Sequence, residues 1–117
     1  MLRTMGGGVW NGSRNPSIVG AWAVIQAGGT GKLHSSYNVA TYTDGGAGVH
    51  ALTFTIPFAS ASEYAIVGSC SPTTTNTQIY VNETTDATAN SVSVVTINTS
   101  NALVDQDPTM VICVGRR

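Results

Sequence analysis

From residue 18 onward, the chain is a succession of short segments in which apolar or β-branched residues recur at every second position. This period of two is typical of β-strands, and no window of the sequence supports a long amphipathic helix, which repeats every 3.6 residues. The segments that predict strands are Ile18–Gln26, Leu33–Val39, His50–Ile56, Tyr64–Cys70, Gln78–Val81, Ser91–Thr99 and Met110–Val114. The chain is therefore expected to be all-β.

Turn signals separate these segments. Asp44-Gly45-Gly46 is a hairpin signal that favours positive φ, and Asp107-Pro108 precedes the last strand. With 117 residues, the chain has room for one domain and one core. Seven or eight short strands at this spacing predict an antiparallel, jelly-roll-like β-sandwich over residues 18–117. Residues 1–17, with their glycine run and turn signals, are predicted to form a flexible N-terminal arm.

Charge is scarce in this sequence. Charged residues make up 9% of the chain and the formal net charge is −1, whereas soluble domains carry about 25% charged residues. A near-neutral surface rich in Ser, Thr, Asn and Gly gives little colloidal repulsion and is typical of a protein that is normally assembled. Nucleic acid is not an expected partner, because binding it requires clustered Lys and Arg, and the chain has five in all.

The N-terminus lacks the continuous apolar stretch of a signal peptide. No apolar run approaches the ~20 residues that a membrane-spanning helix needs. The chain is therefore expected to be made in the cytoplasm of the host cell and not to insert into a membrane.

The sequence offers no recognisable arrangement of catalytic residues. None of the six carboxylates and two histidines falls into an acid–base or nucleophile pattern, so neither a catalytic residue nor a cofactor is predicted. The run Gly28–Lys32 resembles a phosphate-binding loop but lacks the earlier glycine and the following Ser or Thr, and it predicts a turn. His34, His50, Cys70 and Cys113 are too scattered for a structural zinc site. Both cysteines are expected to be small buried hydrophobes, with a disulfide left open.

Two pairs of loop acids, Asp105 with Asp107 and Glu83 with Asp86, offer oxygen ligands of the kind that calcium takes. Solvated loops are the preferred interpretation, so no metal site is predicted. His34 and His50 are expected to be exposed on their strands.

Two groups of side chains are candidates for contacts with other molecules. The strand Ile18–Gln26 is apolar on both faces and is expected to be buried on both, either centrally or against another subunit. The assembly candidates are Trp10, Ile18 and Trp22, although Trp22 is, with Phe54 and Tyr64, also a core candidate. The binding candidates are Tyr37, Tyr42 and Tyr80, which lie beside polar loops and are suited either to stacking on a sugar or partner surface or to ordinary amphipathic packing.

The order of these motifs resembles a β-rich module found at or near the C-terminus of tail fibres of tailed bacteriophages, especially marine phages. The resemblance covers roughly residues 20–115. The motifs that carry it are Ala21-Trp22, Gly29-Thr30-Gly31, Ser36-Tyr37-Asn38-Val39, Thr43–Gly48, Leu52–Thr55, Pro57, Tyr64–Ser69, Val92-Ser93-Val94, Asn98, Asp105 and the apolar strand that closes at Gly115. The chain departs from that module at His50, where an aromatic is usual, and at Ile25, where phenylalanine is usual.

The resemblance implies a non-enzymatic structural protein of the virion, an oligomer whose expected form is a homotrimer, contacting other virion proteins. As a tail-fibre or tail-tip protein it would touch a glycan or receptor on the host through loops such as Ala59–Ser62 and Pro72–Thr77. The alternative is a capsid decoration protein whose arm, Arg3 to Ser17, lies along the shell. A third and less favoured role is a tail-associated enzyme that degrades polysaccharide, which would need a pair of carboxylates in a groove.

Overall fold

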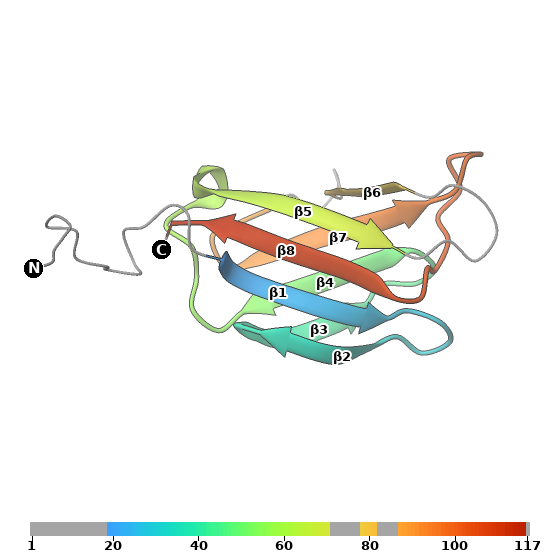
Figure 1. The fold of residues 1–117 in the computed structure, drawn as a ribbon, viewed down its shortest axis with the longest axis horizontal. Helices are drawn as coiled ribbons and strands as arrows, with labels where there is room; N and C mark the ends of the chain where they lie inside the picture. The colour runs from blue at the N-terminus through green and yellow to red at the C-terminus, as the bar shows by residue number, and fades with distance from the viewer. Residues whose placement is uncertain (1–18, 71–77, 82–86, 117) are drawn as a thin grey trace, which may run out of the picture.

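Two four-stranded antiparallel sheets pack face to face in the computed structural model, which describes residues 19–70, 78–81 and 87–116 (Figure 1). Sheet A has the order β2-β1-β8-β5 and sheet B the order β3-β4-β7-β6. The strands are β1 (Val19–Gln26), β2 (Lys32–Tyr37), β3 (Val39–Asp44), β4 (Val49–Phe54), β5 (Tyr64–Cys70), β6 (Gln78–Val81), β7 (Ser91–Ile97) and β8 (Thr109–Gly115). The prediction of an antiparallel β-sandwich is confirmed. The predicted arm lies outside the described residues.

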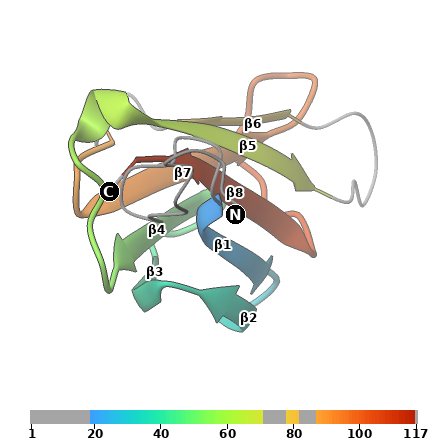
Figure 2. The same ribbon diagram turned by 60° about the vertical axis from the view of Figure 1, so that its left-hand side comes forward.

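Hairpins and long-range pairings alternate in this topology. β1 pairs with β2, β3 with β4 and β6 with β7, whereas β1 and β5 flank the last strand, β8. Because Val19 lies opposite Val114, β1 begins and β8 ends at the same end of the sandwich, which we call the terminal end (Figures 1 and 2). The opposite end, which we call the distal end, carries the β1–β2 turn, the β3–β4 turn and the segment Asp105–Pro108 that leads into β8.

The core lies between the sheets and is built from the inward-facing residue of each alternating pair. Its fully buried members are mostly small or β-branched, and they are Ala21, Ala23, Ile25, Ala27, Leu52, Phe54, Phe58, Val92, Val94, Val111 and Cys113. Three rings close the core near the terminal end, where Phe58 stacks on Tyr64 at a centroid distance of 4.2 Å and Phe54 meets both edge-on. Phe54 and Tyr64 were expected in the core, and both contribute to it.

The segment Leu33–Val39, predicted as one strand, is two strands in different sheets. The chain turns at Asn38, which has a φ of 56° and joins β2 in sheet A to β3 in sheet B. Its side-chain amide nitrogen donates to the carbonyl oxygens of Gly20 (2.8 Å) and Ile56 (2.9 Å), and its oxygen accepts from the Ile56 amide (2.7 Å). Asparagine tolerates positive φ better than most residues do, and these bonds hold the corner in place.

The first strand is not buried on both faces within the single chain, so the expectation of central burial is wrong, and burial against another subunit stays a prediction. A bulge between Val19 and Ala21 shifts the register against β8, so that Val19 is exposed and does not share the buried face of Ile25. Ala21, Ala23 and Ile25 point into the core, whereas Trp22 is half-buried on the outer face. The predicted strand His50–Ile56 is also different in the structure, because β4 ends at Phe54 and Ile56 lies exposed beyond it.

Candidate functional site

The outer face of sheet A carries most of the exposed large apolar side chains of the described residues. Directly paired residues on neighbouring strands share a face of the sheet, so the printed registers define rows of side chains that cross all four strands. One row runs through Tyr37, Trp22, Ile112 and Val67, and a second through Ser35, Val24, Met110 and Ser69. A shorter third row holds Val19, Val114 and Ala65. We call these three rows the sheet A face.

The rows are exposed to an unusual degree for apolar side chains. Val67 is 60% exposed, Tyr37 48% and Ile112 43%, and Val19 and Met110 are also exposed. None of the residues in the three rows is charged. Lys32, the charged residue of β2, lies beyond the rows at the distal margin of the sheet. Scattered exposed hydrophobes are ordinary, but a contiguous apolar patch of this kind marks a surface that contacts another molecule.

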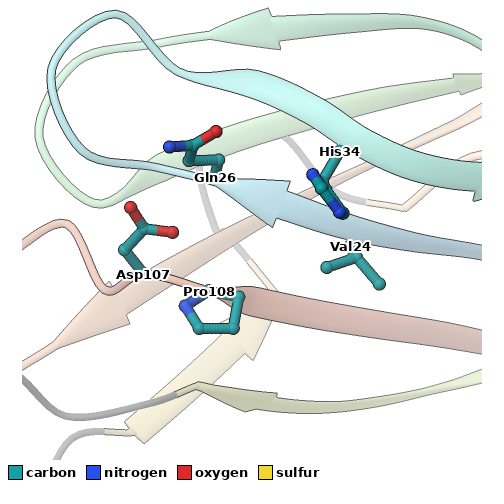
Figure 3. Close-up of a pocket in the computed structure, with 5 residues that line it drawn as sticks. All are labelled: Val24, Gln26, His34, Asp107 and Pro108. Carbon is teal, nitrogen blue, oxygen red and sulfur yellow. The ribbon is translucent and has the colours of Figure 1, made fainter.

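A shallow hollow of about 310 Å³ lies at the distal end of the same sheet (Figure 3). Val24 and Pro108 supply its apolar surface, and Gln26, His34 and Asp107 supply its polar groups. Figure 3 shows Gln26 and Asp107 together at one end of the hollow and His34 beside Val24 at the other. An amide, an imidazole and a carboxylate beside apolar carbon can hydrogen-bond a small polar group, although the volume is at the lower limit for ligand sites.

A second polar cluster lies inside the distal end of the sandwich. His50 on β4 is fully buried, and its Nδ1 lies 3.0 Å from the hydroxyl oxygen of Tyr42 on β3. Its Nε2 is buried without a hydrogen-bond partner in the described part of the chain. Burial lowers the pKa of His50, and the nearby carboxylates of Asp105 and Asp44 oppose this only in part. Burial, together with the same two carboxylates, raises the pKa of Tyr42 to about 12.

The expectation that His50 is exposed on its strand is therefore wrong. It faces the core because β4 alternates strictly from Val49, which places His50, Leu52 and Phe54 on the inner face. Tyr42 stacks beside its ring at a centroid distance of 6.1 Å and compensates one of the two ring nitrogens. His34, in contrast, is exposed on β2, as expected.

The carboxylates near this cluster brace turns. Asp44 accepts from the amides of Gly31 (2.8 Å) and Gly46 (3.0 Å), which ties the β3–β4 turn to the β1–β2 turn across the two sheets. These two backbone hydrogen bonds lower the pKa of Asp44. Asp105 accepts from the amide of Gly48 at 2.7 Å. Within the described ranges, no three His, Cys, Asp or Glu side chains gather as a group that could hold a metal ion.

The three predicted binding tyrosines do not form one site. Tyr37 lies on the sheet A face beside Trp22, whereas Tyr42 belongs to sheet B and packs against the core. Tyr80 lies on β6 opposite Val95. Of the predicted assembly residues, Trp22 lies at the centre of the longest apolar row, and Trp10 and Ile18 fall outside the described residues.

Sequence reasoning identified Trp22 and Tyr37 but missed Val67, Met110 and Ile112, because alternation along one strand does not show which of two apolar faces points outward. It also missed the hollow, whose residues come from three separate segments. Cys70 lies opposite Thr109 and Cys113 opposite Ile66, so the two cysteines are four residues apart along β8. Neither forms a disulfide, and at about 3.3 Å per residue they are too distant for one, because the Cα atoms of a disulfide lie within about 7 Å.

The described residues contain no helix long and apolar enough to cross a membrane. Comparisons of the chain with protein-family models, with curated proteins and with solved structures found no match.

Proposed function

We propose that this protein is a non-enzymatic structural component of a tailed-phage virion, a surface-displayed homo-oligomeric β-sandwich that takes part in host attachment at a tail fibre or tail tip. The observation that carries the proposal is the sheet A face, because three uncharged rows that expose Tyr37, Ile112 and Val67 call for a protein partner. The low charge of the whole chain and its resemblance to tail-fibre modules support the same role.

In this proposal the two ends of the sandwich have different roles. Because the polar hollow lies at the distal end, we assign attachment to the rest of the particle to the opposite, terminal end. The distal end then points away and presents the polar hollow of Gln26, His34 and Asp107. A host-surface glycan is the expected partner of that end, since its hydroxyl groups match the donors and acceptors of the hollow.

A test of host attachment is competition for susceptible cells. Purified protein should adsorb to cells and slow infection, and Asp107→Asn combined with His34→Ala should weaken both effects. Thr41→Ala, at an exposed position on β3 of the other sheet, is the matched control and should compete like the unmodified protein. Protein that neither adsorbs nor competes would contradict a role in attachment.

A capsid decoration protein is the second candidate, and the position of the apolar surface on the face of a sheet favours it. The exposed hydrophobes cover a broad sheet rather than loop tips, which suits copies packed side by side on a shell. A decoration protein binds the folded capsid and should therefore raise the melting temperature of empty capsids by an amount that increases with its concentration. Capsids that neither bind the protein nor change in melting temperature would exclude this role.

The non-enzymatic part of the proposal rests on how the described acids are used. Glu63 lies 3.4 Å from Arg116, and Asp44 and Asp105 accept backbone hydrogen bonds in turns. Asp107 is the described carboxylate that lines the hollow, whereas glycoside hydrolysis uses a pair. An assay for reducing sugar released from host capsule tests this point, and activity above that of Asp107→Asn would overturn it.

A further inference from the structure

We propose that a second copy of this chain covers the sheet A face and that this contact builds the homo-oligomer. The inference rests on the oligomeric part of the proposed function and names the surface through which the copies meet. The occupant is argued from three properties of the face, namely its shape, its charge and its area.

The shape of the face suits another sheet. Tyr37, Trp22, Ile112 and Val67 form a straight row across all four strands, with aromatic side chains on β2 and β1 and aliphatic ones on β8 and β5. Two sheets pack about 10 Å apart when rows of side chains interdigitate. The two sheets of this sandwich already pack in that way, so the outer face of a second copy offers the same kind of surface.

The charge of the face favours a copy over a partner of another kind. The rows consist of apolar residues, small residues and two serines, Ser35 and Ser69. A face without charge can meet itself with no like-charge pair to separate and no ion to desolvate. An acidic or basic partner would find no complementary group among these rows.

The area of the face comes close to the lower limit for a specific contact. Four strands about 4.8 Å apart and seven residues of about 3.3 Å each give a flat footprint of roughly 450 Å² per copy. Two copies together therefore bury about 900 Å² when each face is treated as a plane and the protruding side chains are ignored. This area is close to the ~1,000 Å² at which specific interfaces begin. The central place of Trp22, half-buried and flanked by apolar neighbours on both strands, fits the residue type that dominates such contacts.

Charge insertion on the face tests the proposal. Ile112→Glu places a carboxylate near the centre of the expected contact and Val67→Glu places one on its edge strand, β5. An unpaired buried charge weakens association by at least about 100-fold. Ile56→Glu and Leu103→Glu are the matched controls, because Ile56 is 51% and Leu103 47% exposed and both lie outside the face. The readout is mass by light scattering during gel filtration, over a range of protein concentrations.

The expected result is an oligomer for the unmodified chain and for both controls, and a monomer for both face variants. Circular dichroism and a milder variant, Val67→Ser, guard against misfolding, and Val67→Ser should weaken the oligomer without a change in spectrum. If Val67→Glu and Ile112→Glu remain oligomeric, the face is wrong but an assembled virion protein still stands. If the unmodified chain is a monomer at 100 µM, the proposal is overturned, and the location on a virion is then decided separately by microscopy of particles.

Discussion

His50 combines complete burial with an unsatisfied polar atom. The Tyr42 hydroxyl lies within hydrogen-bonding distance of its Nδ1, but Nε2 is buried without a hydrogen-bond partner among the described residues. An uncompensated buried nitrogen costs about 1–3 kcal/mol of folding free energy. Protonation inside the sandwich would cost more, and for this reason the pKa of the folded-state imidazole is lowered from 6.5.

Stability should therefore depend on pH through His50. Below about pH 6.5 the unfolded chain takes up a proton at this histidine while the folded chain resists it, so acid favours unfolding. We expect the free energy of unfolding to fall as pH is lowered from 7 to 5, with a slope of up to about 1.4 kcal/mol per pH unit. Urea unfolding at a series of pH values measures this slope.

His50→Phe should flatten the slope in this window. The backbone hydrogen bonds of Asp44 lower its pKa, so the stability that Asp44 contributes is lost only below about pH 4. This loss lies outside the window from pH 7 to 5 in which His50 acts. A flat profile for the unmodified chain between pH 7 and 5 would show that His50 titrates normally.

Asn38 supports the corner between the sheets with three hydrogen bonds. Asn38→Gly keeps the positive φ accessible but removes these bonds, and we expect a loss of about 1–3 kcal/mol in unfolding free energy. Asn101→Gly, at an exposed position with a φ of 61°, is the matched control and should change stability by less than about 0.5 kcal/mol. Equal effects of the two substitutions in urea unfolding would refute a special role for Asn38.

At the scale of elements, the first strand shows how a local irregularity decides a face. The bulge between Val19 and Ala21 brings Gly20 against the ring of Phe58, and a Cβ at Gly20 would overlap that ring. The bulge also turns Val19 outward, so the same irregularity that closes the core near the terminal end adds Val19 to the sheet A face.

Gly20→Ala should consequently destabilise the domain by about 1–3 kcal/mol, because the overpacked ring of Phe58 must shift. Gly28→Ala is the control, since a Cβ there would meet Asp107 at an ordinary 3.4 Å. Thermal unfolding of the two variants measures the difference. If the Gly20→Ala variant melts at the same temperature as the unmodified chain, the bulge accommodates the added Cβ without a loss of stability.

Elements whose limits are set locally could be predicted from the sequence. The strands Tyr64–Cys70 and Gln78–Val81 have the predicted bounds, and Asp44-Gly45-Gly46 begins the turn between β3 and β4. The break at Asn38 could not be predicted in the same way, because the alternation of apolar and polar residues continues through it. Its conformation is held by hydrogen bonds to Gly20 and Ile56, both 18 residues away in the chain.

At the scale of the whole molecule, the sheet order decides what the sequence leaves open. β1 has apolar residues on both faces, and only its place beside β8, with sheet B on one side, determines that Ile25 is core and Trp22 is surface. The sheet order also decides the facing of two neighbours on β8, because Val111 is buried in the core whereas Ile112 is exposed. The fold class therefore followed from periodicity, whereas the candidate face required the pairing of four strands.

The described part of the sandwich has the apolar sheet A face, a terminal end and a distal end. We propose assembly, attachment and exposure on a particle as their respective roles. In the proposed arrangement Val67 and Ile112, which are exposed on the single chain, would be buried between copies. Gln26, His34 and Asp107 would remain exposed near the distal end. The central claim is that the chain is a structural part of a virion.

Immunogold electron microscopy of intact, purified virions, with antibody raised against this chain and pre-immune serum as control, tests that claim most directly. We predict gold at the tail or its tip, in keeping with host attachment, and gold over the head would replace attachment with capsid decoration. Virions that carry no gold above the control, although the same antibody detects the protein in infected cells, would contradict the claim.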